Sequence, residues 1–337
     1  MRVMVWHVHG GWMDSFLRGG HEYLLPVPNG APLGRTMSGV REVPAEQLRH
    51  EDVDAVVLQR LEELEWATRL LGRVPGRDVP AVFVEHNTPK RHPVSERHAL
   101  ADQREIPIVH VTHFNRLAWD TGAARVTVVE HGIPDPGHRY TGEEASLGVV
   151  INEPVRRGRV TGTDLLPRFS DAGRLDCFGI DSDRLPAALG LAPNRLRVLG
   201  DLPTDRLHSE LARRRAYLHP FRWTSLGLSL LEAMSMGMPV LALATTEAPR
   251  AVPPEAGAVS ADPEELFAAA RTLLADPDEA RERGRRARAF AREHYGLDRF
   301  LSDWDAVLAQ LSCPRDRTRP APHRPRVAAH TEEGIPT

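Results

Sequence analysis

The sequence has little of what builds secreted or membrane-spanning proteins. It contains two cysteines in 337 residues, Cys177 and Cys313, which are too few for a disulfide framework and favour a reducing compartment. No run of eighteen apolar residues occurs, so the sequence predicts no membrane-spanning helix. The first apolar stretch is short and is interrupted by His7 and His9, which indicates a strand and no signal peptide. We therefore expect a cytoplasmic protein, and peripheral contact with a membrane stays open.

An excess of charge of one sign is also missing. The formal net charge is -3 at pH 7, so bulk electrostatics give no indication of nucleic acid as a partner. The hydrophobic content of 41% and the charged content of 26% are ordinary for a soluble globular protein. A length of 337 residues suggests about two domains.

Short apolar strands alternate with helical patterns along the whole chain. Val-rich strands in such alternation predict an α/β fold in which parallel sheets are covered on both faces. We expect about five strands in each half, and therefore two doubly wound domains of similar kind. The predicted strands lie within residues 2–8, 55–59, 80–86, 107–113 and 124–132, and then within 147–152, 175–180, 196–201, 216–220 and 239–244.

The boundary between the domains is predicted near residues 131–146, which are rich in Pro, Gly and polar residues. Further along, residues 276–296 form a highly charged pattern for which Asp276 is a good N-cap, so we expect a solvated helix there. The complete division predicts an N-terminal domain over 1–140, a C-terminal domain over 147–296, an amphipathic helix over 297–311 and a disordered tail over 312–337.

The stretch "TSLGLSLLEAMSMGMPVLALATTE", residues 224–247, predicts a helix followed by a strand. Thr224 or Ser225 is expected as the N-cap, which leaves the N–H groups of Leu226, Gly227 and Leu228 free to bind an anion. Gly costs about 1 kcal/mol in a helix relative to Ala, and it is favourable where a diphosphate approaches the backbone closely.

The same helix carries one carboxylate, Glu232, among apolar residues. Helical spacing puts Ser225, Ser229 and Glu232 on one face, so the carboxylate would lie where it can accept hydrogen bonds from the ribose hydroxyls of a bound nucleotide. On spacing alone, an exposed polar stripe of an amphipathic helix explains these residues equally, and both interpretations stay open. Gly237 is expected to end the helix.

The segment resembles the donor-binding signature of retaining Leloir glycosyltransferases with the GT-B fold, the glycogen-synthase-like and mannosyltransferase-like group known as glycosyl transferases group 1. The signature reads Glu-x-Phe-Gly-x-x-x-x-Glu-Ala-Met-x-x-Gly-x-Pro-Val. Seven residues match it at the right spacing, namely Gly227, Glu232, Ala233, Met234, Gly237, Pro239 and Val240. Further similar segments are "VVEHGIPDP", residues 128–136, and "GGHEYLLP", residues 19–26, which resembles the end of the family's first helix.

The resemblance implies two Rossmann-like domains that face each other across a cleft. The nucleotide sugar would bind mainly to the C-terminal domain and a hydroxyl acceptor to the N-terminal one, while the helix over 297–311 would cross back to the N-terminal domain. It further implies sugar transfer with retention and without a metal, with Glu232 on the ribose. Two alternatives remain, a non-catalytic nucleotide-sugar binder and a nucleotide-sugar epimerase or hydrolase on the same fold.

The sequence departs from the family pattern at charged positions. Thr224 replaces the first glutamate of the signature, and Leu226 replaces the usual Phe. In "VRRGRVTGTDLLP", Arg156 falls at the position of an arginine that contacts the diphosphate, whereas Thr161 replaces the lysine. Arg157 or Arg159 is then expected to supply the second positive charge. The alternative for this segment is a basic turn on the surface.

In the N-terminal half the resemblance singles out His86, which ends a predicted strand where relatives carry a histidine beside the sugar. His113 is a lesser candidate for the same reason. Gly10 and Gly11 follow the first strand and would allow a phosphate or sugar close to the backbone. For Trp12, stacking on a sugar and packing in the core both stay open.

Two further features are candidates for the site. Thr245, Thr246 and Glu247 follow a predicted strand, where either donor contacts or a plain turn would explain them. Among the Asp-x-Asp pairs, Asp181 and Asp183 follow a predicted strand, where a polar turn explains them better than a metal site. His7 and His9 could share one strand face, but no third ligand lies close in sequence. We therefore expect neither a metal nor a cofactor.

Overall fold

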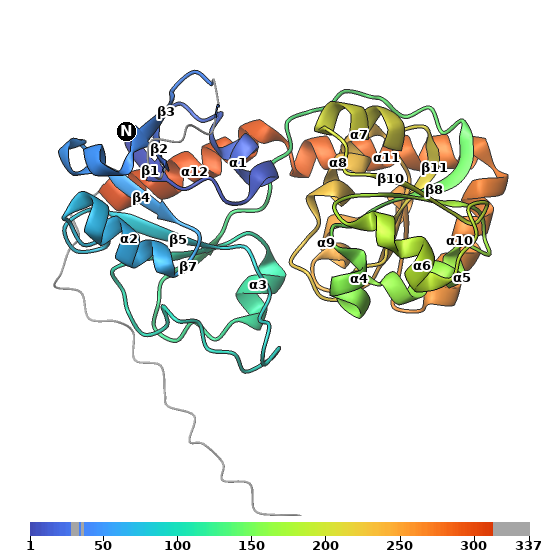
Figure 1. The fold of residues 1–337 in the computed structure, drawn as a ribbon, viewed down its shortest axis with the longest axis horizontal. Coiled ribbons are helices and arrows are strands. Elements are labelled where there is room, and N and C mark those ends of the chain that lie inside the picture. The colour runs from blue at the N-terminus through green and yellow to red at the C-terminus, as the bar shows by residue number, and fades with distance from the viewer. Residues whose placement is uncertain (28–33, 35–36, 313–337) are drawn as a thin grey trace, which may run out of the picture.

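The computed structural model describes residues 1–27, 34 and 37–312. Two α/β domains lie side by side, and the last helix of the chain returns from the second domain to the first (Figure 1). The predicted fold class is confirmed, because each domain is built on a parallel, Rossmann-like sheet. The predicted tail over 312–337 falls outside the described residues from residue 313 onward, and so does Cys313.

The N-terminal sheet has seven strands within the described residues, in the order β3-β2-β1-β4-β5-β6-β7, and all its pairs are parallel. The strand order reverses between β1 and β4, and ligands bind parallel sheets outside the carboxyl ends of the strands at such a point. The strands are β1 (Arg2–Val5), β2 (Glu22–Val27), β3 (Val40–Pro44), β4 (Ala55–Leu58), β5 (Ala81–Glu85), β6 (Ile108–His110) and β7 (Val126–Val128).

The C-terminal sheet has the order β10-β9-β8-β11-β12-β13, again with all pairs parallel. Its corresponding reversal lies between β8 and β11. The strands are β8 (Glu144–Val150), β9 (Leu175–Phe178), β10 (Leu196–Gly200), β11 (Arg214–His219), β12 (Val240–Leu243) and β13 (Gly257–Ser260).

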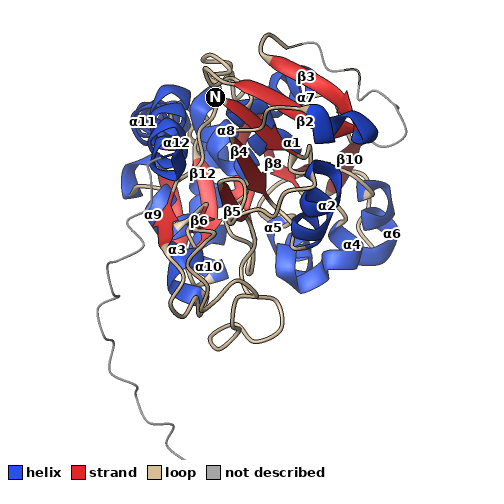
Figure 2. Cartoon of the chain, turned by 90° about the vertical axis from the view of Figure 1, so that its left-hand side faces the viewer, coloured by secondary structure: helices blue, strands red, loops and turns tan. Residues whose placement is uncertain are grey.

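Helices flank the strands on both sides (Figure 2). Those of the N-terminal half are α1 (Gly10–Phe16), the 3-10 helix η2 (Ala45–His50), α2 (Glu62–Leu71) and α3 (His113–Ala118). Those of the C-terminal half are α4 (Pro154–Arg157), η3 (Gly158–Thr161), η4 (Thr163–Leu165), α5 (Leu166–Phe169), η5 (Ser182–Arg184), α6 (Leu185–Leu189), α7 (Thr204–Leu211), α8 (Leu228–Met236), α9 (Ala248–Ala251), η6 (Pro254–Ala256), α10 (Pro263–Ala275) and α11 (Pro277–His294).

The last helix, α12 (Leu297–Ser312), packs on the N-terminal domain beside α1. Trp304 is buried against Trp12 and Phe16, with ring centroids 5.6 and 5.1 Å apart. A side chain at Gly132 would meet the Cβ of Phe300 at 2.2 Å, so the connection between the domains fits against α12 only as glycine. Trp12 is therefore a core residue, which decides between the two interpretations of it.

Several local predictions are confirmed. The Asp276 carboxylate accepts hydrogen bonds from the backbone N–H groups of Asp278 and Glu279, both at 3.0 Å, and so caps α11. Gly237 ends α8 with a left-handed φ of 92°, as expected of a C-terminal glycine. The ten predicted strand segments all contain or overlap strands.

The predicted count of about five strands in each half is wrong. It omits β2 and β3 in the first sheet and β13 in the second. Of residues 19–26, compared above with the end of a helix, residues 22–26 instead belong to β2. These strands escaped prediction because β2 and β3 each contain a proline and β13 is built of small residues, so their apolar pattern is weak.

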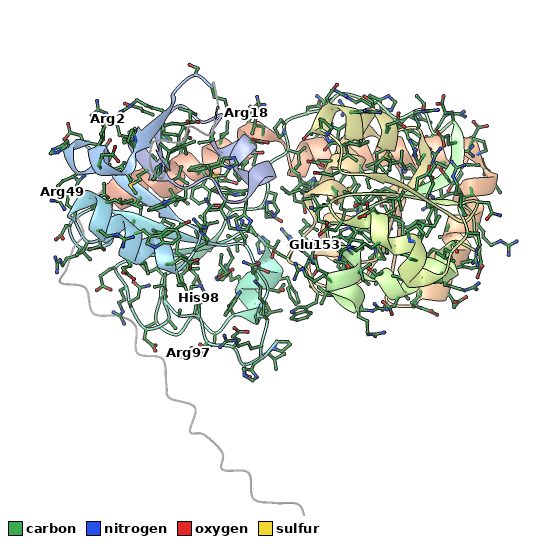
Figure 3. All side chains as sticks on the ribbon, viewed as in Figure 1. Arg2, Arg18, Arg49, Arg97, His98 and Glu153 are labelled. Carbon is green, nitrogen blue, oxygen red and sulfur yellow. The ribbon has the colours of Figure 1, made fainter. Side chains whose placement is uncertain are left out.

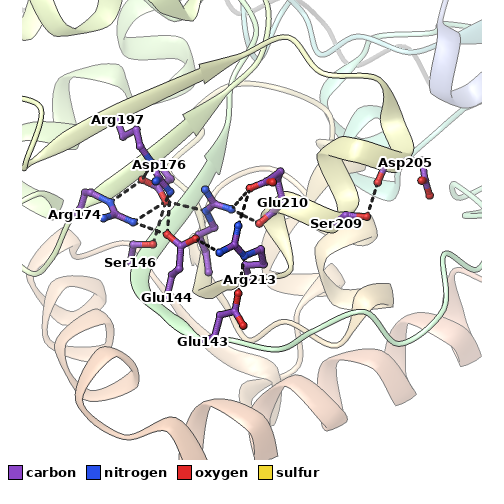
Figure 4. Close-up of polar contacts among 11 residues, drawn as sticks. Glu143, Glu144, Ser146, Arg174, Asp176, Arg197, Asp205, Ser209, Glu210 and Arg213 are labelled. Carbon is purple, nitrogen blue, oxygen red and sulfur yellow. Dashed lines mark hydrogen bonds and ion pairs between the residues drawn. The ribbon is translucent and has the colours of Figure 1, made fainter.

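At the amino ends of strands in the second sheet, an ionic network, most of whose side chains are partly exposed, surrounds the buried carboxylate of Asp176 (Figure 4). The Asp176 carboxylate accepts hydrogen bonds from Arg174, Arg197 and Arg214, at 2.7 to 3.2 Å. The side chains of Asp176 and Arg214 have no exposed surface. Burial by itself would raise the pKa of this carboxyl, but the arginines outweigh burial and hold its pKa below the ordinary value.

Within the described residues, no helix has both the length and the apolar character needed to cross a membrane. Cys177 is a free thiol buried in β9.

Candidate functional site

Loops at the carboxyl ends of strands from both sheets touch at the domain interface. The first turn of α1 abuts the first turn of α8, since a side chain added at Gly11 would meet the Cδ1 of Leu228 at 2.8 Å. Beside this contact, the hydroxyls of Thr112 and Ser225 lie 3.3 Å apart and are buried. The edges where α/β domains bind ligands therefore meet across the interface.

The helix with the signature begins later than predicted. Gly227, with φ −73° and ψ 123°, is the N-cap of α8, and no side chain caps the helix. Thr224 and Ser225 therefore lie before the helix, and the N–H of Leu226 is not one of its free donors. The N–H groups of Leu228 and Ser229 make no hydrogen bond within the described residues, so the donors that can receive an anion begin at Leu228.

The close approach at Gly227 explains why this residue is glycine. A Cβ there would lie 2.7 Å from the Cε1 of His219, at the end of β11. The preceding Leu226 is buried in the core under α8, which draws residues 224–226 out of the helical path. Burial lowers the pKa of His219 to about 3, so its imidazole is neutral.

Glu232 lies one turn into α8 on a partly exposed face. Its side chain is 22% exposed, and its Oε2 lies 3.5 Å from the Nε2 of His208 on α7. Ser229, on the same helix, instead shares a hydrogen bond of 2.8 Å with the hydroxyl of Tyr217. The predicted common face is thus incomplete, because Ser225 is outside the helix, but Glu232 keeps carboxylate surface for a ligand.

The basic segment follows β8 and lies beside the end of β11. Figure 3 places Glu153 on the side of the C-terminal domain that faces the N-terminal domain. Arg156 is 70% exposed and forms an ion pair with Glu153, and Arg159 is 77% exposed and forms one with Asp164. Two of the three predicted phosphate ligands are therefore paired with carboxylates in this structure.

Arg157 differs from its neighbours. It is partly buried, its guanidinium lies 6.0 Å from the Phe221 ring centroid, and no carboxylate forms an ion pair with it within the described residues. Burial, followed by the charge of Arg156, lowers its pKa, although a guanidinium remains charged. Thr161, which stands for the family's lysine, is buried and hydrogen-bonds Thr163 at 3.2 Å.

On the N-terminal side, Gly10 and Gly11 form the first turn of α1, with His9 as its N-cap. His86 follows β5 and lies against His9, with ring centroids 4.0 Å apart, and meets the edge of Trp12 at 5.1 Å. Burial, followed by the nearby imidazoles of His9 and His131, lowers the pKa of His86 well below its ordinary value. His86 is therefore neutral at physiological pH.

Glu247 links the two domains. Its Oε2 accepts a hydrogen bond of 2.7 Å from the backbone N–H of Phe114 at the start of α3. The carboxylate is buried, and burial raises its pKa. Thr245 donates to the carbonyl of Phe221 at 2.6 Å, so this loop is tied to protein groups on both sides. His113 is exposed beside the same contact, 3.9 Å from Glu130.

Metal-binding geometry does not occur in the part of the chain that the structure describes. No group of three or more His, Cys, Asp or Glu side chains there is arranged to hold an ion. Asp181 has a left-handed φ of 55° and precedes η5, in the polar turn that its position after β9 suggests.

Comparisons with known proteins bear on both the second domain and the complete fold. Residues 165–276 match the family described as Glycosyl transferases group 1. The matched region includes Gly227 and Glu232 but begins after Arg156, Arg157 and Arg159. None of the curated proteins matches the chain.

Solved structures extend the similarity to both domains. Sucrose-phosphate synthase from Thermosynechococcus elongatus superposes with a TM-score of 0.72 and 14% identity, over 92% of this chain and 99% of that one. HepE of Anabaena, solved with UDP-glucose, superposes with a TM-score of 0.66 and 14% identity, over 92% of this chain and 100% of that one. AviGT4, a glycosyltransferase of avilamycin A biosynthesis, superposes with a TM-score of 0.60 and 18% identity, over 93% of this chain and 98% of that one. The chain has the GT-B fold, and with the family match this indicates a glycosyltransferase.

Sequence reasoning did not find two residues at the site of this glycosyltransferase. Gln59 follows β4 and contacts His86 at 3.0 Å, and His208 contacts Glu232. The position of Gln59 at the carboxyl end of a predicted strand was a usable signal, since ligands gather at that edge. His208 had none, because the pairing of α7 with α8 is a tertiary contact.

Proposed function

We propose that the protein transfers a sugar from a nucleoside diphosphate sugar to a hydroxyl acceptor, with retention at the anomeric carbon and without a metal or other cofactor. The contact of Gly11 with Leu228 is the observation that carries this proposal. It brings the free N–H groups of α8, which suit a diphosphate, to the edge of the N-terminal sheet where His86 lies. HepE, which has the same fold, binds UDP and UDP-glucose.

In this proposal, α8 and the basic segment hold the donor. The N–H groups of Leu228 and Ser229 bind the diphosphate, and the Glu232 carboxylate accepts hydrogen bonds from the ribose hydroxyls. Arg157 is favoured as the cationic ligand because Arg156 and Arg159 already pair with carboxylates. Arg156 and Arg159 become ligands if the donor displaces Glu153 and Asp164 from them. This displacement costs little free energy, because exposed ion pairs contribute little to stability.

The reaction breaks the bond between the anomeric carbon and the diphosphate oxygen, and it forms a bond from the same carbon to the acceptor oxygen. Negative charge grows on the leaving diphosphate, where the helix dipole and Arg157 stabilise it. The proton of the acceptor hydroxyl passes to a diphosphate oxygen, so no separate base is required. Closed contact between the domains keeps water from the sugar, which limits hydrolysis.

A non-catalytic nucleotide-sugar binder is the second candidate. It is favoured by Thr224 and Thr161, which replace charged family residues, and Thr161 is buried away from a ligand. An epimerase or hydrolase on the same fold would need acid and base groups at the sugar, and the described residues at the interface offer no clear pair of that kind.

A panel of UDP-, GDP- and dTDP-sugars with simple glycoside acceptors tests the proposal. Release of nucleoside diphosphate that depends on acceptor, and persists in EDTA, supports metal-independent transfer, and the anomeric configuration of the product tests retention. Release without acceptor would indicate hydrolysis, and conversion to another nucleotide sugar would indicate epimerisation. Binding without release would favour the binder. Cell fractionation tests the cytoplasmic location, which the two cysteines favour.

A further inference from the structure

Three side chains converge at the point where the strand order of the N-terminal sheet reverses. His9 follows β1, Gln59 follows β4 and His86 follows β5. His86 lies between the other two, because its ring lies 4.0 Å from that of His9 and its Nε2 is 3.0 Å from the Oε1 of Gln59. The three residues occupy the edge of the sheet that faces the start of α8.

The orientation of the Gln59 amide is fixed by its surroundings. Gln59 is buried, and its Nε2 lies 2.8 Å from the carbonyl oxygen of Trp6, which can only accept. The amide nitrogen must therefore point to Trp6, and the amide oxygen to His86. The backbone N–H of Gln59 also donates to the Glu63 carboxylate at 2.7 Å, which holds the residue in place.

This orientation determines the tautomer of His86. The Oε1 of Gln59 is an acceptor, so the Nε2 of His86 must carry the proton that it receives. The ring is neutral, and its Nδ1 therefore has a free lone pair. That nitrogen has no hydrogen-bond partner within the described residues. It is also absent from the fully buried polar atoms without a partner, so some of its surface is exposed. It is thus an acceptor that a ligand can reach.

We propose that Gln59 is a positioning residue, which locks His86 in the Nε2–H form so that its Nδ1 accepts a hydrogen bond from a hydroxyl of the sugar or the acceptor. That the hydroxyl belongs to a sugar or an acceptor rests on the proposed function, whereas the tautomer of His86 does not. An imidazole that accepted in this way would favour ligands with a hydroxyl over deoxy analogues, because the deoxy ligand leaves Nδ1 unpaired.

Nitrogen-15 NMR of histidine-labelled protein tests the tautomer without any substrate. The His86→Asn variant assigns the His86 signals. In the wild-type spectrum at pH 7.5, the two nitrogen signals of His86 are expected to be those of a protonated Nε2 and a pyridine-like, unprotonated Nδ1. A His86 that is charged, or protonated at Nδ1, overturns the proposal, and this measurement requires no altered Gln59.

Two substitutions then test Gln59 itself. Gln59→Leu removes the acceptor, and the His86 signals are expected to shift to values that average both neutral tautomers. Gln59→Glu places a carboxyl that must be protonated to donate to the Trp6 carbonyl, as burial favours, and its other oxygen still accepts from His86, so this variant is expected to retain the Nε2–H form. Unchanged His86 signals in Gln59→Leu, in a protein with wild-type circular dichroism, refute the role of Gln59 in holding the tautomer.

Kinetics separate this inference from the proposed function. With a donor and acceptor that turn over, Gln59→Leu is expected to lower kcat roughly tenfold to 100-fold while the Kd of the donor nucleotide stays within twofold. A wild-type kcat in Gln59→Leu overturns the positioning role alone. Absence of turnover with every substrate counts against the proposed function and against the hydroxyl contact, but it leaves the tautomer result standing.

Discussion

Substitution of Glu232 by Gln tests the nucleotide site most directly. The carboxylate is proposed to accept two hydrogen bonds from the ribose diol, and its side chain is 22% exposed, so both oxygens need not be enclosed by protein. Hydrogen bonds to a charged group contribute about 1.5–3 kcal/mol. Gln keeps one neutral acceptor and loses the other, so a loss of about 1.5–3 kcal/mol in binding is expected, which is roughly 10-fold to 100-fold in Kd.

The stability of the protein should change much less. The contact of Glu232 with His208 is long, at 3.5 Å, and is partly exposed, and such pairs contribute at most about 1 kcal/mol. Calorimetric titration with a nucleoside diphosphate measures the binding, and thermal unfolding checks the fold. Glu293→Gln, an exposed carboxylate on α11, is the matched control and should bind as the wild type does.

A ligand lacking both ribose hydroxyls completes the test as a thermodynamic cycle. The wild type is expected to bind the 2′,3′-dideoxy nucleotide more weakly than the ribonucleotide by at least the factor that the substitution costs. Because Gln keeps one acceptor, Glu232→Gln should distinguish the two nucleotides less than the wild type does. If the variant discriminates between them as strongly as the wild type, the carboxylate does not hold the ribose and the donor assignment is refuted.

Three further predictions concern stability. Asp176→Asn should lose about 3–5 kcal/mol of unfolding free energy in urea, against at most about 1 kcal/mol for the exposed Asp171→Asn. Because arginines lower the pKa of Asp176, the carboxylate stabilises the fold less once the pH falls below 3.8, the ordinary pKa of an aspartate. The difference in unfolding free energy between wild type and Asp176→Asn should therefore shrink there. Burial raises the pKa of Glu247, so the folded protein takes up a proton there as the pH falls from 8 towards 4.5. The unfolding temperature of the wild type should therefore rise relative to that of Glu247→Gln over this range. A difference in unfolding temperature that does not change with pH contradicts this prediction. Gly227→Ala, whose Cβ meets an imidazole carbon at 2.7 Å, should lose about 1–3 kcal/mol in urea, whereas Gly20→Ala, with open space around it, should change little.

The sequence carries the fold class because the alternation of strands and helices is a local signal. It also indicates the end of α8 at Gly237 and the cap of α11 at Asp276, since each depends on a few neighbouring residues. Strands with a weak apolar pattern are not predicted, because their stability comes from neighbouring strands and not from a local signal. β2 is stabilised by its place between β1 and β3, which only the assembled sheet provides.

The start of α8 illustrates how tertiary contacts override a local rule. Thr224 and Ser225 are good N-caps by composition, yet the helix begins three residues later. Leu226 enters the core, and Gly227 must pass directly over His219. Both contacts are between residues that no spacing rule connects, so the site could be located from the sequence to within one helical turn and no closer.

Charge partners set a second limit on prediction. The sequence predicts Arg156 as a phosphate ligand by position and leaves either Arg157 or Arg159 as the second. The ion pairs of Arg156 with Glu153 and of Arg159 with Asp164 leave Arg157, of these three, without a carboxylate partner among the described residues. Glu153 is the N-cap of α4 and lies three residues before Arg156, so this pair is open to prediction from spacing, while the second pair spans a turn between η3 and η4. Predicting a ligand from charge therefore requires knowing which charges are already satisfied.

The two halves of the proposed site belong to separate cores, so their alignment depends on how the domains are joined. Their facing ends meet at Gly11 and Leu228. Behind this contact, α11 packs so closely on the end of α8 that a side chain at Gly284 would meet the carbonyl oxygen of Gly237 at 2.0 Å. The chain then continues into α12, where Trp304 packs against α1. Helices α8 and α1 are thus held together both at their first turns and through α11 and α12, so packing outside the proposed site helps to set the distance from the free N–H groups of α8 to His86.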